Sequence, residues 1–342
     1  MRLSAIGDVC HAVATVQAIQ QRHPEAKITW IIGKVEATLL VNLTNIEFII
    51  FDKSNGFSAY SNLRKTLQKR HFDILLHMQV ALRASIATLF IRAKEKWGFD
   101  KKRAKEGQWL FTNKRIKAQI NPHVVDGFWG FALALGVDNI TVPAWHMPIS
   151  SKAERWSLEL TKNSPYIVIS PAASKAERNW LVDGYAAIAD HATSKGFNIC
   201  LSGGQTELEK SLATDICEAS NAPINNLMGQ TSLPQLLALI KNAKLVLSPD
   251  SGPCHMATMV DTSVIGLYAH SNFNRTGPYL SRDNCVSVYE QVLKEQTGNN
   301  VLENRWGMRV KGDNLMGRIS IQQVKEKFDQ IVRNQVTDKI IL

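Results

Sequence analysis

Residues 245–256, with the sequence LVLSPDSGPCHM, carry the first group of side chains whose types and spacing can support chemistry. An apolar run leads into Asp250, Ser251 and Gly252. A proline follows. Proline suits the first position of a helix, because an N–H group at that position would have no hydrogen-bond partner within the helix. Backbone N–H groups at such a start attract phosphate. His255 can add a donor to a diphosphate oxygen, and Asp250 can orient the loop or contact the ligand. An ordinary strand-to-helix turn is the alternative.

Two further segments of the second half combine small residues with polar side chains. The sequence PAASKAERNW places Ser174, Lys175 and Arg178 after a predicted strand, where arginine can bind a diphosphate through two parallel hydrogen bonds. The sequence LSGGQTE joins a glycine pair, which lets a ligand approach the backbone, to Glu207, which can accept hydrogen bonds from ribose hydroxyls. Solvated surface loops are the alternative for both. Because all three segments follow strands of one predicted sheet, they predict a shared phosphate-binding edge.

Near the start of the chain, the sequence SAIGD ends in Asp8, next to a predicted helix. Gly7 permits an unusual backbone conformation, and a carboxylate is favoured at a helix N-terminus. The simplest interpretation is a local capping role for Asp8. A wider role stays open on these residues alone.

The elements that must position these residues alternate between strand and helix. Short β-branched runs predict the strands, and apolar residues three and four positions apart predict the helices. In the first half the strands are 28–32, 47–51 and 73–77, and the helices are 9–22, 34–43, 59–70, 80–91 and 122–135. In the second half the strands are 166–170, 198–202, 244–248 and 263–269, and the helices are 153–161, 184–195, 207–219, 233–242 and 321–332.

Alternation of this kind predicts an α/β protein with a parallel, doubly wound sheet in each half. We expect two Rossmann-like domains, 1–155 and 156–342, because proline-containing and polar residues interrupt the pattern before residue 155. Such sheets bind ligands at the carboxyl ends of their strands, so the expected site lies in a central cleft.

Composition narrows the classes of function. No run approaches the roughly 18 to 20 apolar residues of a membrane span, so we expect a cytoplasmic protein. Five cysteines form no CxxC pair, which argues against structural zinc.

The net charge is +10, and residues 92–117 hold ten Lys/Arg against three Asp/Glu. This segment therefore faces an anionic partner or is a solvated loop. The sequence has no GxGxxG dinucleotide motif after a strand, no GxxxxGK(S/T) P-loop motif and no GxSxG hydrolase motif. It also lacks the helix-turn-helix, zinc-finger and RNP signatures of nucleic-acid-binding proteins.

The chain resembles glycosyltransferase family 9, the ADP-heptose:lipopolysaccharide heptosyltransferases. The resemblance spans nearly the whole sequence: RLSAIGDVCHAVATVQAIQ, GFDKKRAKEGQWLF, SPAASKAERNW, LSGGQTE, SPDSGPCHMA and TGPY. It implies a GT-B fold, with the acceptor on the N-terminal domain and the nucleotide-sugar donor on the C-terminal one. It also implies a peripheral position at the inner face of the inner membrane.

Carried over residue by residue, the resemblance makes Asp8 the catalytic base. The donor residues are then Ser174, Lys175, Arg178, Glu207 or its neighbour Glu209, Asp250, Ser251, Gly252 and His255. The basic residues Lys101, Lys102 and Arg103, in a segment that also holds Trp97, Phe99 and Trp109, would meet an anionic, lipid-linked acceptor such as Kdo-lipid A.

We expect direct displacement with inversion, without a metal or cofactor, because no Asp-x-Asp occurs and fixed cations can stabilise the departing diphosphate. Two alternatives stay open: a relative using another nucleotide sugar, and a non-catalytic module that binds nucleotide sugar or lipid. One departure from the family is that only three residues precede the Ser4–Asp8 turn, where relatives have a full strand. We therefore expect a start codon assigned too late, and a higher stability when upstream codons are restored.

Overall fold

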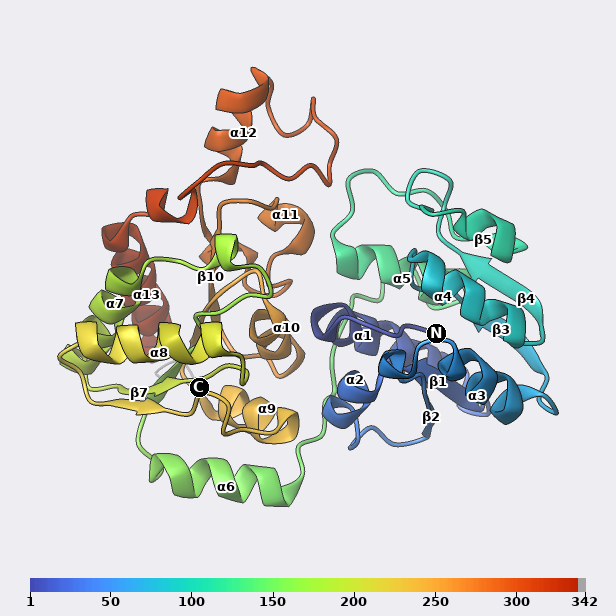
Figure 1. Ribbon diagram of the computed structural model, residues 1–342, viewed down its shortest axis with the longest axis horizontal. Helices are drawn as coiled ribbons and strands as arrows, with labels where there is room; N and C mark the ends of the chain where they lie inside the picture. The colour runs from blue at the N-terminus through green and yellow to red at the C-terminus, as the bar shows by residue number, and fades with distance from the viewer. Residues whose placement is uncertain (338–342) are drawn as a thin grey trace. The chain divides into compact units, whose positions relative to one another are not determined.

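The computed structural model describes residues 1–337. These residues divide into two compact units, with the division between Pro148 and Ile149 (Figure 1). The division lies before α6 (Ser151–Thr161), whereas the predicted boundary at residue 155 falls inside this helix. The whole of α6 belongs to the second unit because it packs on α9 (Leu233–Asn242). Lys241 also forms an ion pair with Glu154 across these two helices, with 3.3 Å between the charged atoms.

The first unit, unit 1, has only parallel strand pairs, between helices that follow the predicted pattern. Its strands are β1 (Ile28–Ile32), β2 (Ile46–Ile50), β3 (Phe72–Leu76), β4 (Ala93–Gly98) and β5 (Lys114–Arg115). Its helices are α1 (Ile6–Arg22), α2 (Lys34–Leu39), α3 (Ser58–Leu67), α4 (Leu82–Ala87) and α5 (Val124–Ala134), with 3-10 turns η1 (Lys53–Asn55), η2 (Thr88–Phe90) and η3 (Gln108–Phe111).

The first three residues join the two strand sets of unit 1. On one side, the Arg2 N–H donates to Ile31 and the Gly33 N–H donates to the Leu3 carbonyl, at 3.3 and 2.9 Å. On the other side, the Met1 amino group donates to the Leu76 carbonyl at 2.6 Å. Counted as a strand, residues 1–3 give the doubly wound order 3-2-1-4-5-6. The short segment before Asp8 therefore lies at the centre of the sheet.

The second unit, unit 2, has one six-stranded parallel sheet within its described residues 149–337, in the order β11-β10-β9-β6-β7-β8. Its strands are β6 (Tyr166–Ile169), β7 (Asn198–Leu201), β8 (Ile224–Asn226), β9 (Val246–Pro249), β10 (Val264–Tyr268) and β11 (Val286–Ser287). Its other helices are α7 (Val182–Ser194), α8 (Glu207–Ala219), α10 (Gly252–Met259), α11 (Phe273–Thr276), α12 (Tyr289–Thr297) and α13 (Ile321–Thr337), with 3-10 turns η4 (Ala176–Arg178), η5 (Arg282–Asn284) and η6 (Met316–Arg318).

Helices of unit 2 cover the sheet from both sides, as a doubly wound fold requires (Figure 1). A large apolar cluster built from the central strands, α7 and α13 forms its core. Each central strand is buried along its whole length, which explains why β6, β9 and β10 read as continuous apolar runs.

The strands that the sequence did not predict are polar or short. β4 reads AKEKWG and is mostly half-exposed, so it lacks the apolar run of a buried strand. β5, β8 and β11 have two or three residues each. The helix predicted at 80–91 is also shorter: α4 ends at Ala87 and continues as the 3-10 turn η2. Among residues 1–337, no helix has both the length and the apolar character needed to cross a membrane.

Candidate active site

The predicted phosphate-binding edge of unit 2 lies at the topological switch point of its sheet. β6 and β9 are neighbours at the centre, and the chain moves outward from β6 to β7 and β8, and from β9 to β10 and β11. Loops that leave adjacent strands in opposite directions open a crevice at the carboxyl ends, where doubly wound sheets bind ligands. The loop after β6 carries Ser174, Lys175 and Arg178, and the loop after β9 carries Asp250 and Ser251.

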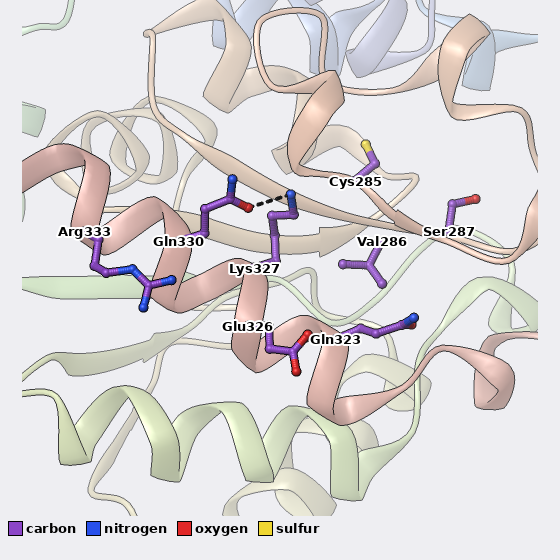
Figure 2. A pocket seen from close by; sticks show the side chains of 8 residues that line it. All are labelled: Cys285, Val286, Ser287, Gln323, Glu326, Lys327, Gln330 and Arg333. Atoms are coloured by element: carbon purple, nitrogen blue, oxygen red, sulfur yellow. Dashed lines mark hydrogen bonds between the residues drawn. The ribbon is translucent and has the colours of Figure 1, made fainter.

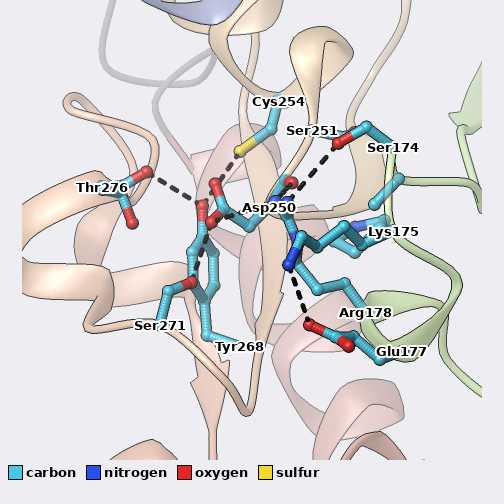
Figure 3. Close-up of polar contacts among 12 residues, drawn as sticks. Ser174, Lys175, Glu177, Arg178, Asp250, Ser251, Cys254, Tyr268, Ser271 and Thr276 are labelled. Atoms are coloured by element: carbon cyan, nitrogen blue, oxygen red, sulfur yellow. Dashed lines mark hydrogen bonds and ion pairs between the residues drawn. The ribbon is translucent and has the colours of Figure 1, made fainter. Parts of the chain in front are cut away.

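Asp250 is the centre of the polar contacts at this edge (Figure 3). Its carboxylate accepts a hydrogen bond from the Ser271 hydroxyl at 2.8 Å, and it lies 3.6 Å from Arg178 Nη1 and 3.8 Å from His255 Nε2. Burial opposes ionisation of Asp250, but His255, Ser271 and Arg178 together hold its pKa below the usual value. With only 13% of its side chain exposed, Asp250 is suited to orient the loop.

Arg178 connects the two loops. Its Nη1 donates to the Asp250 carbonyl at 3.0 Å, and its Nη2 donates to the Ser174 hydroxyl at 3.4 Å. Its Nε is buried without a hydrogen-bond partner. A guanidinium with a spare donor between two strand ends is well placed for an anion. Lys175 is different, because it is exposed and pairs only loosely with Glu177, at 3.7 Å.

The start of α10 follows directly after Asp250. Ser251 is the N-cap residue, but no side chain caps the helix start, because the Ser251 hydroxyl pairs with that of Ser248 at 2.8 Å. Gly252 opens the helix and a proline follows. The Ser251 hydroxyl thus leaves the start of α10 uncapped beyond the strand end, which suits a phosphate site. His255 lies in this first turn, only 7% exposed.

Glu207 and Glu209 follow the glycine loop after β7 and differ in their contacts. Glu209 forms a capping box with Thr206 and accepts a hydrogen bond from the Gly204 N–H at 2.9 Å. A Cβ atom on Gly204 would lie 2.6 Å from this carboxylate. Glu209 therefore supports the loop, and the glycine at position 204 leaves room for its carboxylate. Glu207 is 90% exposed beside Lys210 and can reach a ligand, so the ribose assignment to Glu207 stays a prediction.

In unit 1, Asp8 lies in the first turn of α1, directly after the central segment 1–3. It forms an ion pair with Arg2, whose side chain is 11% exposed. Arg2 is held in turn by the Met78 carbonyl at 2.8 Å and by the Phe128 ring, whose centroid is 5.3 Å away. About a third of the Asp8 side chain is exposed, so a substrate hydroxyl can reach it. The predicted base is thus accessible and firmly oriented.

In the basic segment, residues 92–117, some side chains are exposed and others form contacts within the protein. Lys101 and Lys102 are exposed in the turn after β4. Arg103, by contrast, forms an ion pair with the buried Asp100 and donates to Gln119 at 2.6 Å. Phe99 is also turned inward, 8% exposed and packed against Phe131 with ring centroids 5.1 Å apart. The structure therefore presents the two lysines, and not Arg103 or Phe99, as the accessible part of this prediction.

Two residues of the site were missed from the sequence. Ser271 fixes Asp250 from the loop after β10, and Arg2 fixes Asp8. Nothing in the sequence marks Ser271, because it lies 21 positions from Asp250 and only the pairing of β9 with β10 joins them. For Arg2, the opposite charge six positions before Asp8 was the available signal.

A polar pocket of about 630 Å³ lies between β11 and α13 (Figure 2). Its lining includes Cys285, Ser287, Lys327 and Arg333, none of which belongs to the predicted site. It is formed by an edge strand and a helix face and not by the loops after β6, β7 and β9, so it has no part in the assignment of the donor residues. Within the part of the chain that the structure describes, no group of three His, Cys, Asp or Glu side chains could hold a metal ion.

Known proteins of one family match this chain. The model of glycosyltransferase family 9 (heptosyltransferase) matches residues 60–305. The lipopolysaccharide core heptosyltransferase OpsX of Haemophilus influenzae is 44% identical over 325 residues, covering 95% of this chain and 93% of that protein. Lipopolysaccharide heptosyltransferase 3 of Escherichia coli K12 is 23% identical over 274 residues, covering 77% of this chain and 79% of that protein.

Solved structures match in fold over the same extent. A family 9 glycosyltransferase from Veillonella parvula superposes with a TM-score of 0.78 at 19% identity, covering 97% of this chain and 95% of that one. ADP-heptose lipopolysaccharide heptosyltransferase II of E. coli gives 0.73 at 19% identity, with 98% of both chains covered. E. coli heptosyltransferase WaaC, solved with ADP, gives 0.72 at 18% identity, covering 97% of this chain and all of that one. The predicted GT-B fold class is confirmed, and with the match of the family model and the 44% identity the chain belongs to glycosyltransferase family 9, the heptosyltransferase family.

Proposed function

We propose that this enzyme transfers a heptose from ADP-heptose to an inner-core acceptor of lipopolysaccharide, at the cytoplasmic face of the inner membrane. The observation that carries the proposal is the 44% identity with a lipopolysaccharide core heptosyltransferase over 95% of the chain. The polar edge of unit 2 supports it, because a guanidinium that is only 14% exposed and an uncapped helix start suit a diphosphate.

In the proposed reaction, Asp8 takes the proton of an acceptor hydroxyl as its oxygen forms a bond to the anomeric carbon of the sugar. The bond from that carbon to the diphosphate oxygen breaks from the opposite side, so the configuration inverts and ADP leaves with the electron pair. Arg178 and the N–H groups at the start of α10 stabilise the negative charge that grows on the leaving diphosphate. Asp250 positions both through its contact with Arg178 and its place before α10.

The donor side also includes Glu207 at the ribose, with Ser174 and Lys175 near the phosphates. On the acceptor side, Lys101 and Lys102 meet the anionic groups of a Kdo-lipid A type acceptor. Arg103 supports their turn by holding Asp100. Nucleic acid is not a proposed partner.

A transfer assay with several sugar donors tests the proposal. Mass spectrometry of a Kdo-containing acceptor should show the mass of one added heptose with ADP-heptose, and much less product with ADP-glucose or a UDP-sugar. Preferred transfer of a different sugar would replace the heptose assignment, and an absence of transfer from every donor would favour a binding protein.

The same assay with EDTA tests the role of fixed cations. We expect turnover to persist in excess EDTA, because Arg178 and the start of α10 take the place of a divalent metal at the diphosphate. Loss of activity that returns on addition of Mg²⁺ or Mn²⁺ would contradict a metal-independent reaction.

A further inference from the structure

One surface of unit 1 exposes large apolar side chains beside lysines. It consists of Leu82 at the start of α4, Trp109 and Leu110 in η3, and Lys101 and Lys102 in the preceding turn; we name it the Trp109 surface. Leu82 and Trp109 are each 47% exposed, and Leu110 is 76% exposed. Water-exposed apolar residues grouped beside lysines are the composition of a surface that binds a membrane interface.

The apolar residues are held outward by a buried support. Gln108, the first residue of η3, is fully buried and accepts a hydrogen bond from the Phe99 N–H at 3.1 Å. Its amide group donates to the carbonyls of His77 and Gln79 at 2.9 and 3.1 Å. The two residues that follow Gln108 are therefore presented to solvent by a fixed turn.

A second contact places α4 in the same surface. Glu106 accepts a hydrogen bond from the Leu82 N–H at 2.6 Å, and α4 packs against η3. A Cβ atom on Gly107, the next residue, would lie 3.5 Å from Leu110. Leu82 and Leu110 are thus fixed to the same short loop.

The acidic residues of this segment are engaged within the protein. Glu106 caps α4, Asp100 pairs with Arg103, and Glu95 pairs with Lys114 at 3.7 Å. Lys101 and Lys102, by contrast, are exposed. The positive charge of the surface matches the negative charge of an anionic bilayer, which attracts lysines within a Debye length.

We propose that the Trp109 surface docks the enzyme on a bilayer of anionic phospholipid, with Trp109 and Leu110 inserted among the headgroups. Lys101 and Lys102 then lie at the level of the lipid phosphates, where the anionic groups of a lipid-linked acceptor also lie. The inference rests on the proposed function in one respect, because a lipid-linked acceptor places the reaction at a membrane.

Co-sedimentation of the full-length enzyme with vesicles tests the proposal. We expect binding to vesicles of about seven parts phosphatidylcholine to three parts phosphatidylglycerol, and about tenfold weaker binding to phosphatidylcholine alone. The double variants Trp109→Ala/Leu110→Ser and Lys101→Glu/Lys102→Glu should each bind at least about tenfold more weakly. Leu302→Ser and Lys294→Glu, changes of exposed residues in unit 2, are the matched controls and should bind like the unchanged protein.

Insertion has its own readout. Brominated acyl chains should quench part of the tryptophan fluorescence of the unchanged enzyme, and Trp109→Phe should bind vesicles but lose that part of the quenching.

Normal vesicle binding by both double variants overturns the proposal. So does a dimer in sedimentation velocity that Trp109→Ala/Leu110→Ser abolishes while vesicle binding persists, since a second copy would then be the occupant.

Failure of this inference is distinguishable from failure of the proposed function. With a delipidated, water-soluble acceptor, Trp109→Ala/Leu110→Ser should retain full turnover, because the apolar residues then have no bilayer to enter. A protein that binds the vesicles through this surface but transfers no sugar keeps the inference and rejects the function. A large loss of turnover on the soluble acceptor overturns the inference, because these residues would then act in the reaction.

Discussion

Asp8 and Arg2 form an ion pair in which the arginine is mostly buried and the carboxylate is partly exposed. The arginine has further partners in the Met78 carbonyl and the Phe128 ring. The pair therefore orients the carboxylate without covering it. This arrangement supports more than a capping role for Asp8, since no side-chain hydrogen bond caps α1.

Asp8→Asn should lower kcat by roughly 10² to 10⁴ while the KM for the sugar donor stays nearly constant. The change removes the proton acceptor and the charge partner of Arg2 in unit 1, whereas the predicted donor residues lie in unit 2. Steady-state kinetics measure both values. Asp126→Asn is the matched control, because Asp126 is also an acid in the first turn of a unit 1 helix but forms a capping box. Near-normal turnover in Asp8→Asn would reject the base assignment.

Ser271 contributes to the donor edge through Asp250. Ser271→Ala removes a hydrogen bond to a carboxylate, worth about 1.5 to 3 kcal/mol, and leaves Asp250 less well oriented beside Arg178. We expect the KM for the donor to rise about tenfold or more, with a smaller change in kcat. Ser194→Ala, at an exposed helix serine, should leave both constants unchanged. An unchanged donor KM in Ser271→Ala would show that Asp250 needs no such support.

At the scale of elements, β3 and α4 are joined by a buried histidine. His77 follows β3, is fully buried, and its Nε2 lies 3.0 Å from the Ser85 hydroxyl in α4. Burial, and then the charges of the N-terminal amine and Arg2, lower the pKa of His77 to about 3, from an ordinary value of 6.5. The neutral ring is therefore part of the packing between these elements.

This pKa predicts a loss of stability in acid. Between pH 6.5 and 3 the unfolded chain binds a proton at His77 that the folded chain does not, so stability falls as pH decreases, by up to about 1.4 kcal/mol per pH unit. Above pH 6.5 the contribution is constant. Urea unfolding from pH 7 to 4 should show a shallower pH dependence for His77→Gln than for the exposed control His71→Gln. Equal slopes in the two variants would contradict a buried neutral His77.

At the scale of the whole molecule, the two units have separate hydrophobic cores. Every predicted donor residue, from Ser174 to His255, lies in unit 2, and Asp8, Lys101, Lys102 and Arg103 lie in unit 1. Binding of the nucleotide and activation of the acceptor are therefore assigned to different units, each with its own doubly wound arrangement.

This division predicts that residues 149–342, expressed alone, bind ADP with a Kd within about threefold of the full chain and transfer no sugar. Isothermal titration calorimetry measures the affinity, and Arg178→Ala in the isolated unit should weaken it. A folded unit 2 that fails to bind ADP, as judged by a cooperative thermal transition, would mean that unit 1 supplies part of the donor site.

The sequence determined the fold class and the positions of most elements, because the burial of parallel strands requires continuous apolar runs that are visible without coordinates. α8 and α9 begin and end where predicted, since Thr206 and Ser232 cap them with local signals. The polar strand β4 and the two- or three-residue strands were invisible, because their identity depends on neighbours that complete their hydrogen bonds.

Local sequence also located the loops of the candidate site, but only the tertiary structure decided what each side chain in them does. Glu207 and Glu209 are equivalent carboxylates in the sequence, and a capping box assigns Glu209 to the loop. Arg103 and Lys102 are adjacent cations, and the buried Asp100 pairs with the guanidinium of Arg103 but contacts only the backbone N–H of Lys102. Ser271 joins Asp250 across two strands. The physical reason is that strand order and burial, which no short stretch of sequence encodes, determine which charges meet and which face solvent.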